Sequence, residues 1–416
     1  MRRQILALAF IFVCTTIAWV VLGATIFSRT YGSNEQLQGR VASTWGTSQQ
    51  QSPPTAAYFL SEVENSTTVE NRKLVVHSRT VHRQVFLPLE ASRIRVNFHL
   101  NPRQKGLLWY STYAVDFAAD YTFRNDTAGR QPIDFRLKFP AQKAIYDGLQ
   151  MKVNDQTVAL ATDDQGTVGR ATLGPGEIGS LHVAYRSQGL DCWRYQLGEG
   201  VAQARDFMLT MQTNFRDIDF ADDTLSPTSK QLIPGGWQLT WQYSNLVSGF
   251  QIGMTMPAKL QPGPLAGEIS YAAPVSLFFF FFLMFIITTI RKIDLHPMNY
   301  FFLATAFFAF HLLLAYLVDH ISIHAAMILA SLVSVMLVVS YLRLAVGLRF
   351  AALEAGTAQL IYLVLFSYAF FWKGFTGLAI TIIAIVTLFV VMQVTGKIRW
   401  SERFAARGGV PVPDLG

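Results

Sequence analysis

The chain has 416 residues, a formal net charge of +7 and a hydrophobic share of 51%, which is close to that of soluble proteins. This average conceals two unlike parts, because almost every residue from Ala272 onward lies in an apolar run, whereas residues 28–268 carry charges every few positions. The charged part has no dense Lys/Arg stripe with interleaved aromatics, so the composition predicts no nucleic-acid partner.

Six apolar stretches approach the roughly 20 residues that cross the hydrocarbon core of a membrane. They cover residues 5–27, 272–290, 298–318, 325–342, 355–371 and 375–395. The basic flanks fall on alternate sides, at Arg2 and Arg3, at Arg291 and Lys292, at Arg343 and Arg349, and at Lys397, Arg399, Arg403 and Arg407. Because basic flanks are retained in the cytoplasm, both termini are expected inside, and the lipid bilayer is the first expected partner.

The first stretch fits two interpretations. Its basic start and the "VLGA" that ends at Ala24 resemble a signal peptide. However, Leu22 stands where a cleavage site needs a small residue, and the run continues through Phe27, beyond the usual length of such a peptide. The sequence therefore favours an uncleaved anchor over residues 1–27.

Residues 28–268 are expected to form a β-rich domain on the periplasmic side. In "YAVDFAADYTF" one face collects Tyr113, Val115, Phe117, Ala119, Tyr121 and Phe123. The same period of two occurs in "RIRVNFHL" and "IDFRLKF", and further strands are expected at "SLHVAYRS", "DFMLTMQTNF", "QLTWQYS" and "FQIGMTM". Many short strands between turn signals such as "LGPGE" and "PGGW" predict a β-sandwich-like domain.

Two segments join this domain to the apolar parts of the chain. Residues 33–54 are rich in Gln and Ser and are interpreted as a helix or a loose linker. The segment "KLQPGPLAGEIS", residues 259–270, is interpreted as a proline-stiffened linker. The predicted fold class is a membrane α+β protein with an N-terminal transmembrane anchor (1–27), a periplasmic β-rich domain (28–268), a five-helix transmembrane bundle (269–400) and a cytoplasmic tail (401–416).

Sequence motifs of well-marked enzyme classes are absent: there is no G-x-x-x-x-G-K, G-x-S-x-G, H-E-x-x-H or C-x-x-C. The acidic run "NFRDIDFADDT" lacks the glycine and the closing glutamate of a calcium loop, and is interpreted as a solvated turn. We therefore expect no catalytic residue, no cofactor and no metal site.

Polar residues gather at one exterior turn, where "LVDHISIHAA" holds Asp319, His320 and His324. The favoured interpretation is a simple hairpin in which Ser322 caps the next helix; the competing hypothesis is that Asp319, His320 and His324 bind a partner or a lipid. Inside the third span, His311 is interpreted as a packing residue with one hydrogen-bond partner, the alternative being a relay or pathway role.

The polar island "RKIDLHPMNY" is expected to be a cytoplasmic hairpin. Pro297 suits the first turn of the following helix, where its missing N–H would have no partner. We interpret "DLHP" as a turn followed by a helix start.

The stretch 295–332, "LHPMNYFFLATAFFAFHLLLAYLVDHISIHAAMILASL", resembles the CreD family of bacterial inner-membrane proteins. It has a Leu-His-Pro-Met-x-Tyr start, a Leu-rich span, an acidic residue followed by His, and an Ala-rich beginning of the next span. The tail "VTGKIRWSE" is similar to the closing segment of the family, with Gly396 and Arg399 departing from its pattern.

This resemblance implies an anchor, a large periplasmic domain and a C-terminal helical bundle. It makes His296, Pro297, Tyr300, Asp319 and His320 motif positions, of which the first three are expected to be structural. It also implies a role in envelope integrity or envelope stress, without enzymatic activity.

Two functions follow as hypotheses. The first is a non-enzymatic inner-membrane protein whose β domain binds another envelope protein or a lipid. The alternative is a transporter or lipid-handling membrane enzyme that uses the turn at Asp319, His320 and His324. Pathways need ionisable residues at depth, and His311 is the one clear case in these spans, so the first hypothesis is favoured.

Overall fold

A computed structural model describes residues 2–70, 73–105, 108–198, 200, 202–372 and 374–396. The chain divides into a helical unit (Met1–Glu35, Gly106–Leu108 and Leu260–Gly416) and a β unit (Gln36–Lys105 and Trp109–Lys259). Each unit has its own buried hydrophobic core. The predicted tail, 401–416, lies outside the described residues.

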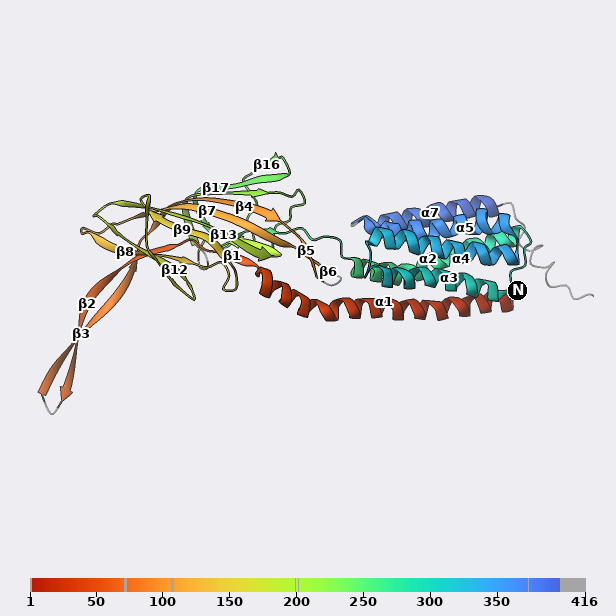
Figure 1. The fold of residues 1–416 in the computed structure, drawn as a ribbon, viewed down its shortest axis with the longest axis horizontal. Coiled ribbons are helices and arrows are strands. Elements are labelled where there is room, and N and C mark those ends of the chain that lie inside the picture. The colour runs from red at the N-terminus through yellow and green to blue at the C-terminus, as the bar shows by residue number, and fades with distance from the viewer. Residues whose placement is uncertain are drawn as a thin grey trace, which may run out of the picture. The chain divides into compact units, whose positions relative to one another are not determined.

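The β unit is built around two large sheets (Figure 1). The larger sheet has the order β10-β9-β13-β7-β4-β15-β17-β16. Its strands are β4 (Leu89–Leu100), β7 (Thr112–Arg124), β9 (Tyr146–Val153), β10 (Gln156–Thr157), β13 (Ile178–Leu190), β15 (Ala202–Thr213), β16 (Ser229–Ile233) and β17 (Gly236–Ser248). The smaller sheet has the order β11-β12-β8-β2-β3. Its strands are β2 (Thr55–Glu70), β3 (Lys73–Phe86), β8 (Gln131–Lys138), β11 (Leu160–Asp163) and β12 (Gly166–Leu173).

Two small sheets complete the strands. The first consists of β1 (Gln49–Gln51), β14 (Cys192–Tyr195) and β18 (Ile252–Thr255). The second pairs β5 (Arg103–Lys105) with β6 (Leu108–Tyr110).

The period-two pattern of the sequence accounts for the core of the β unit. Every second residue of β7 from Tyr113 to Phe123 is buried, so the predicted alternation is confirmed. The same core takes side chains from both large sheets, for example Ile94 of β4 and Phe135 of β8. Alternating strands thus bury one face of each sheet and leave the other for polar residues.

Strands β2 and β3 form a ribbon that continues beyond the smaller sheet (Figure 1). β2 pairs with β8 over only three residues, from Thr55 to Ala57, but pairs with β3 from Ala57 to Glu70. The sequence analysis assigned no strands to this region. Beyond its base, the ribbon therefore has no third strand among the described sheets.

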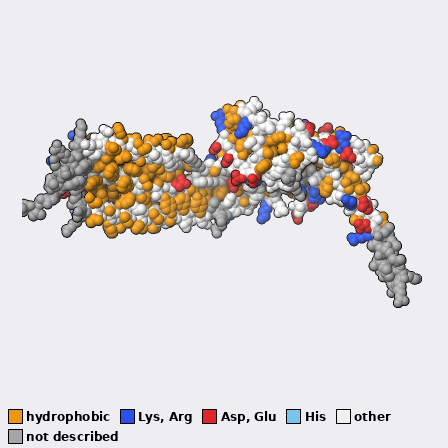
Figure 2. All heavy atoms as spheres, turned by 180° about the vertical axis from the view of Figure 1, so that it is seen from behind, with side chains coloured by type: hydrophobic (Ala, Val, Ile, Leu, Met, Phe, Trp, Pro, Cys, Tyr) orange, Lys and Arg blue, Asp and Glu red, His pale blue; other side chains and the backbone are white. Residues whose placement is uncertain are grey.

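The helical unit begins with the part of α1 (Arg2–Trp45) up to Glu35, and α1 runs well past the predicted anchor limit at residue 27 and into the segment 33–54. The other elements are α2 (Pro262–Ile290), α3 (Pro297–Leu317), α4 (Ile323–Ala345), the π-helix η1 (Phe350–Ala355), α5 (Gly356–Gln359), the π-helix η2 (Leu360–Leu365), α6 (Phe366–Tyr368), the 3₁₀ turn η3 (Ala369–Phe371) and α7 (Thr376–Thr395). Six helical segments of the described chain are long and apolar enough to cross a membrane. Figure 2 shows hydrophobic side chains over the visible surface of these helices, whereas charged side chains are spread over the β unit.

The predicted linker at residues 259–270 is wrong for most of its length, because α2 already begins at Pro262. The reason is a tertiary contact that the local sequence does not reveal. A Cβ added to Gly263 would lie 2.6 Å from Oγ1 of Thr30, and one added to Gly267 would lie 2.8 Å from the ring of Phe27. These glycines, four residues apart, let α1 approach the first turns of α2 as in small-residue helix pairs of membranes.

The short strand β1 carries buried side chains that tie it to β13. Gln49 donates through Nε2 to Oγ of Ser187 at 2.7 Å and to the carbonyl of Gln188 at 2.8 Å. The hydroxyl of Tyr185 donates to Oε1 of Gln51 at 2.7 Å. A β-unit fragment that lacks β1 therefore loses these three hydrogen bonds to β13, in addition to the pairing of β1 with β14.

We predict that the fragment 55–259 is less stable than the fragment 46–259, which retains β1. At roughly 1 kcal/mol for each of the three hydrogen bonds to β13, the free energy of unfolding should fall by at least about 3 kcal/mol. Urea titration of both fragments, followed by circular dichroism, measures the difference. Equal stability of the two fragments would show that β1 is dispensable.

Candidate functional site

The turn between α3 and α4, which the sequence predicts to face the exterior, holds the leading candidate site. α3 ends at Leu317 and α4 begins at Ile323, so Asp319 and His320 lie between the two helices. Ser322 is the N-cap of α4, and its hydroxyl accepts a hydrogen bond from the N–H of Ala325 at 3.4 Å, as expected. The backbone of the turn is therefore fixed by the ends of both helices.

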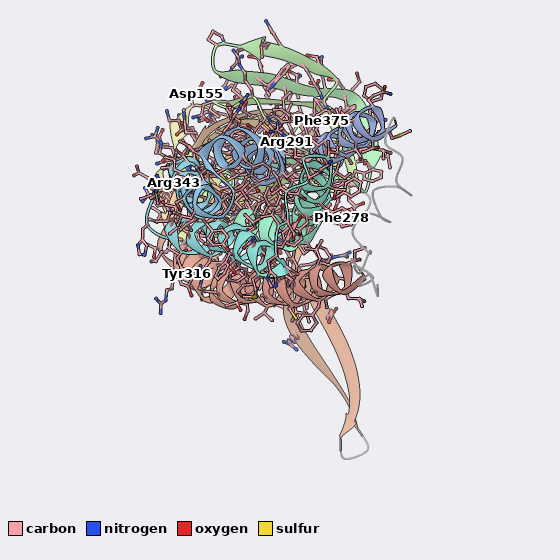
Figure 3. All side chains as sticks on the ribbon, turned by 90° about the vertical axis from the view of Figure 1, so that its right-hand side faces the viewer. Asp155, Phe278, Arg291, Tyr316, Arg343 and Phe375 are labelled. Carbon is pink, nitrogen blue, oxygen red and sulfur yellow. The ribbon has the colours of Figure 1, made fainter. Side chains whose placement is uncertain are left out.

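Asp319 forms an ion pair with Arg29 of α1. Nη1 of Arg29 lies 3.1 Å from Oδ2 of Asp319, and Nη2 donates to Oδ1 at 3.3 Å, so the contact is bidentate. Nη2 also donates to the carbonyl of Ala315 at 2.8 Å, and the guanidinium lies 5.4 Å from the ring centroid of Tyr316, which Figure 3 labels. The side chain of Asp319 is only 19% exposed. This pair joins the first and third membrane-competent helices at one end.

The two histidines of the turn point elsewhere. The ring of His324 stacks on that of Phe371, with centroids 5.0 Å apart, and lies 6.4 Å from Tyr368. His320 is exposed, and within the described residues its side chain has no hydrogen bond or ion pair. The three titratable groups of the turn are therefore neighbours in sequence that diverge in space.

The sequence analysis did not single out Arg29. It lies in "IFSRTYG" at the end of the first apolar stretch, on the same predicted side of the membrane as Asp319. A basic residue and an acidic residue at the predicted exterior ends of two spans could have predicted this ion pair, because charges at the ends of membrane spans are stabilised by pairing.

The expected helix start at "DLHP" is observed. His296 is the N-cap of α3, and its Nδ1 accepts a hydrogen bond from the N–H of Met298 at 3.3 Å, while Pro297 begins the helix. Tyr300 is buried, and its hydroxyl lies 3.5 Å from Oγ1 of Thr288 on α2. The three motif positions thus surround the connection between α2 and α3.

His311 is buried inside the helical unit. Its Nδ1 lies 2.9 Å from the carbonyl oxygen of Phe307, one turn earlier on α3. The imidazole ring meets the ring of Trp19 on α1 edge to face, with centroids 5.6 Å apart. One local hydrogen bond and an aromatic contact with α1 match the interpretation of His311 as a packing residue.

Two histidines of the β unit, His99 and His182, lie beside carboxylates on the polar face of the larger sheet. Nδ1 of His182 is 2.6 Å from Oδ1 of Asp120, and Nε2 of His99 is 3.1 Å from Oδ2 of Asp116. Arg186 donates to Asp116 at 2.6 Å, and this hydrogen bond lowers the pKa of Asp116 below its ordinary value. Within the described residues, no group of three or more His, Cys, Asp and Glu is arranged to hold a metal ion.

A family model matches the helical part of this chain. Residues 268–401 match the family described as inner membrane protein CreD, which confirms the resemblance seen at residues 295–332. The match extends from within α2 to beyond α7. No curated protein matches the chain.

Solved structures show only partial likeness. A candidate nutrient binding protein from Legionella pneumophila has a TM-score of 0.34 and 13% identity, covering 47% of this chain and 71% of that protein. An M1 zinc metallopeptidase from Deinococcus radiodurans has a TM-score of 0.27 and 14% identity, covering 41% of this chain and 42% of the peptidase. Likenesses of this size assign no activity to the chain.

We predict that Arg29→Gln and Asp319→Asn each lower the thermal stability of the protein in detergent. Because the two side chains contact each other, the double variant should be little worse than either single variant, with a coupling energy of about 1 kcal/mol. The exchanged pair, Arg29→Asp with Asp319→Arg, should recover part of the loss.

His320→Ala is the matched control, since it alters the same turn at an exposed side chain. It should leave the melting temperature unchanged. Fully additive effects of Arg29→Gln and Asp319→Asn would contradict the ion pair.

Proposed function

We propose, from the CreD-family match of residues 268–401, that the protein is a non-enzymatic inner-membrane protein of the envelope-integrity or envelope-stress type. Its β unit lies in the periplasm and binds another envelope protein, and both chain termini lie in the cytoplasm. Support for this orientation comes from the basic flanks of the apolar stretches, because such flanks are retained inside.

The observation that carries partner binding is the ribbon of β2 and β3. An isolated two-stranded hairpin is at best marginally stable in water. This ribbon nevertheless extends over 14 cross-strand pairs, from the pair of Ala57 with Phe86 to the pair of Glu70 with Lys73. A partner that covers the ribbon supplies the contacts that a third strand or a packed helix would otherwise provide.

One face of the ribbon carries exposed apolar side chains among polar ones. The register places Phe59 opposite Gln84 and Val63 opposite Thr80, and Phe86 lies on the same face because side chains alternate along each strand. The exposed fractions are 50% for Phe59, 63% for Val63 and 60% for Phe86. Apolar side chains aligned on a protruding element are typical of a protein-interaction surface.

The free edge of the ribbon indicates the chemistry of the partner. β3 is an edge strand that contains Arg79 and Arg83 and has no Asp or Glu in its sequence, whereas β2 contains Glu62 and Glu64. Glu64 stands directly opposite Arg79 in the register. An extended acidic segment that adds to the edge of β3 would repeat this pairing and would satisfy the backbone groups of the edge.

We predict that a photo-crosslinking amino acid at Val63 captures a specific envelope protein in intact cells. Val247 is the matched control, because it is 64% exposed but lies on β17 in the other sheet. Crosslinks from both positions to the same set of proteins, or from neither, would contradict the ribbon as the docking surface.

A second variant tests the role of the ribbon in the cell. Replacing residues 60–83 by a two-residue turn leaves the base of the ribbon and its pairing with β8 in place. If the ribbon binds the partner, this variant, present at normal abundance, should fail to restore resistance to envelope stress in cells that lack the protein. Full restoration would overturn the proposed function.

A further inference from the structure

A groove of about 430 Å³ lies between α3 and α4. The small side chains of Ala306 and Ala309 line its α3 side. Phe302 of α3 and Leu337 of α4 add larger apolar side chains to its walls. Because α3 and α4 are both long and apolar enough to span a membrane, a groove on their surface opens to lipid and not to water.

The polar side chains along the groove are already satisfied within their own helices. Oγ1 of Thr305 donates to the carbonyl of Phe301 at 2.9 Å, and Oγ of Ser340 donates to the carbonyl of Leu337 at 3.0 Å. The length of the groove therefore presents an apolar surface to its occupant.

One end of the groove is cationic. Arg343, in the last turn of α4, lines it together with Tyr341. Figure 3 labels Arg343 at the margin of the helices. Among the described residues, its guanidinium has no hydrogen-bond or ion-pair partner, whereas Arg291 meets Glu354 at 2.5 Å. A charged side chain at the end of a membrane helix is costly unless it reaches the headgroup layer.

Tyr341 gives this end a fixed shape. Its hydroxyl donates to Oδ1 of Asn299 on α3 at 2.7 Å, and its ring contacts that of Phe302, with centroids 5.0 Å apart. The phenol thus bridges α3 and α4 beside Arg343. The apolar length of the groove matches the acyl chain of a phospholipid, and its cationic end beside Tyr341 matches the phosphate.

We propose that this groove binds one anionic phospholipid. An acyl chain lies against Ala306 and Ala309, and the phosphate accepts hydrogen bonds from the guanidinium of Arg343. Arginine and phosphate form paired, charge-assisted hydrogen bonds, and basic pockets between membrane helices on the cytoplasmic side are suited to anionic headgroups. The basic flank that contains Arg343 and Arg349 is the side that the sequence predicts to be cytoplasmic.

The test uses the full chain in detergent, with native mass spectrometry of bound lipid during titration with phosphatidylglycerol or phosphatidylcholine. The protein should retain one phosphatidylglycerol in preference to phosphatidylcholine. Arg343→Gln should weaken phosphatidylglycerol binding about tenfold, the effect of losing one charge-assisted contact, without changing the melting temperature of the lipid-free protein. Ala309→Leu, which fills the groove, should weaken binding of both lipids.

Arg349→Gln is the matched control, because Arg349 belongs to the same basic flank but does not line the groove. It should leave phosphatidylglycerol binding unchanged. If Arg343→Gln and Arg349→Gln weakened phosphatidylglycerol binding equally, the effect would come from general surface charge and the proposal would be overturned. The proposal also fails if neither Arg343→Gln nor Ala309→Leu alters binding, or if the lipid-free protein dimerises through this groove.

Discussion

The arrangement of the helical unit depends on how closely α1 approaches α2. Lipid chains are as apolar as leucine, so burial of apolar surface does not hold membrane helices together, and close van der Waals contact must do so. α1 offers little buried surface along its apolar window. Its contact with α2 relies on glycines, since a Cβ on Gly23 would lie 2.9 Å from the ring of Tyr271, and Gly267 meets Phe27 in the same way.

The polar contacts of α1 follow from this approach. Arg29 lies two residues after Phe27, so the helix that packs against Gly267 also carries the guanidinium to Asp319, just beyond the end of α3. Deeper along α1, Trp19 meets His311 of the same helix α3. A partly exposed ion pair contributes about 1 kcal/mol or less, so the packing supplies most of the stability. The ion pair and the Trp19–His311 contact fix the rotation of α1 about its axis.

The local sequence pattern was enough to predict the elements that short-range interactions determine. The alternation in β7 follows from the burial of one sheet face, and the start of α3 follows from a proline preceded by a capping side chain. The linker prediction at residues 259–270 failed because glycine and proline weaken a helix in isolation. There the contact with α1 makes the same glycines favourable.

The candidate site shows the same limit. Asp319, His320 and His324 are close together in the sequence. However, residues before and after the start of a helix point in different directions, and of these three only Asp319 contacts α1. Its partner, Arg29, is 290 residues away in the chain, so the pairing depends on helix packing that no local pattern contains. The ribbon of β2 and β3 escaped prediction for the opposite reason: most of its length has no packed face to impose an apolar alternation.

The cations at the ends of the membrane helices differ in how they are neutralised. Arg29 and Arg291 each meet an acid from a distant segment, and in both pairs the acid is the less exposed partner. Such pairs connect helices, because losing either member leaves a partly buried charge without its partner. Arg343 has no such acid among the described residues, and it stands at the end of a groove that is otherwise apolar. A cation that has no acid among the described residues is available to a phosphate at the membrane boundary, so the helices that Arg29 and Arg291 connect to one another would meet the bilayer through Arg343.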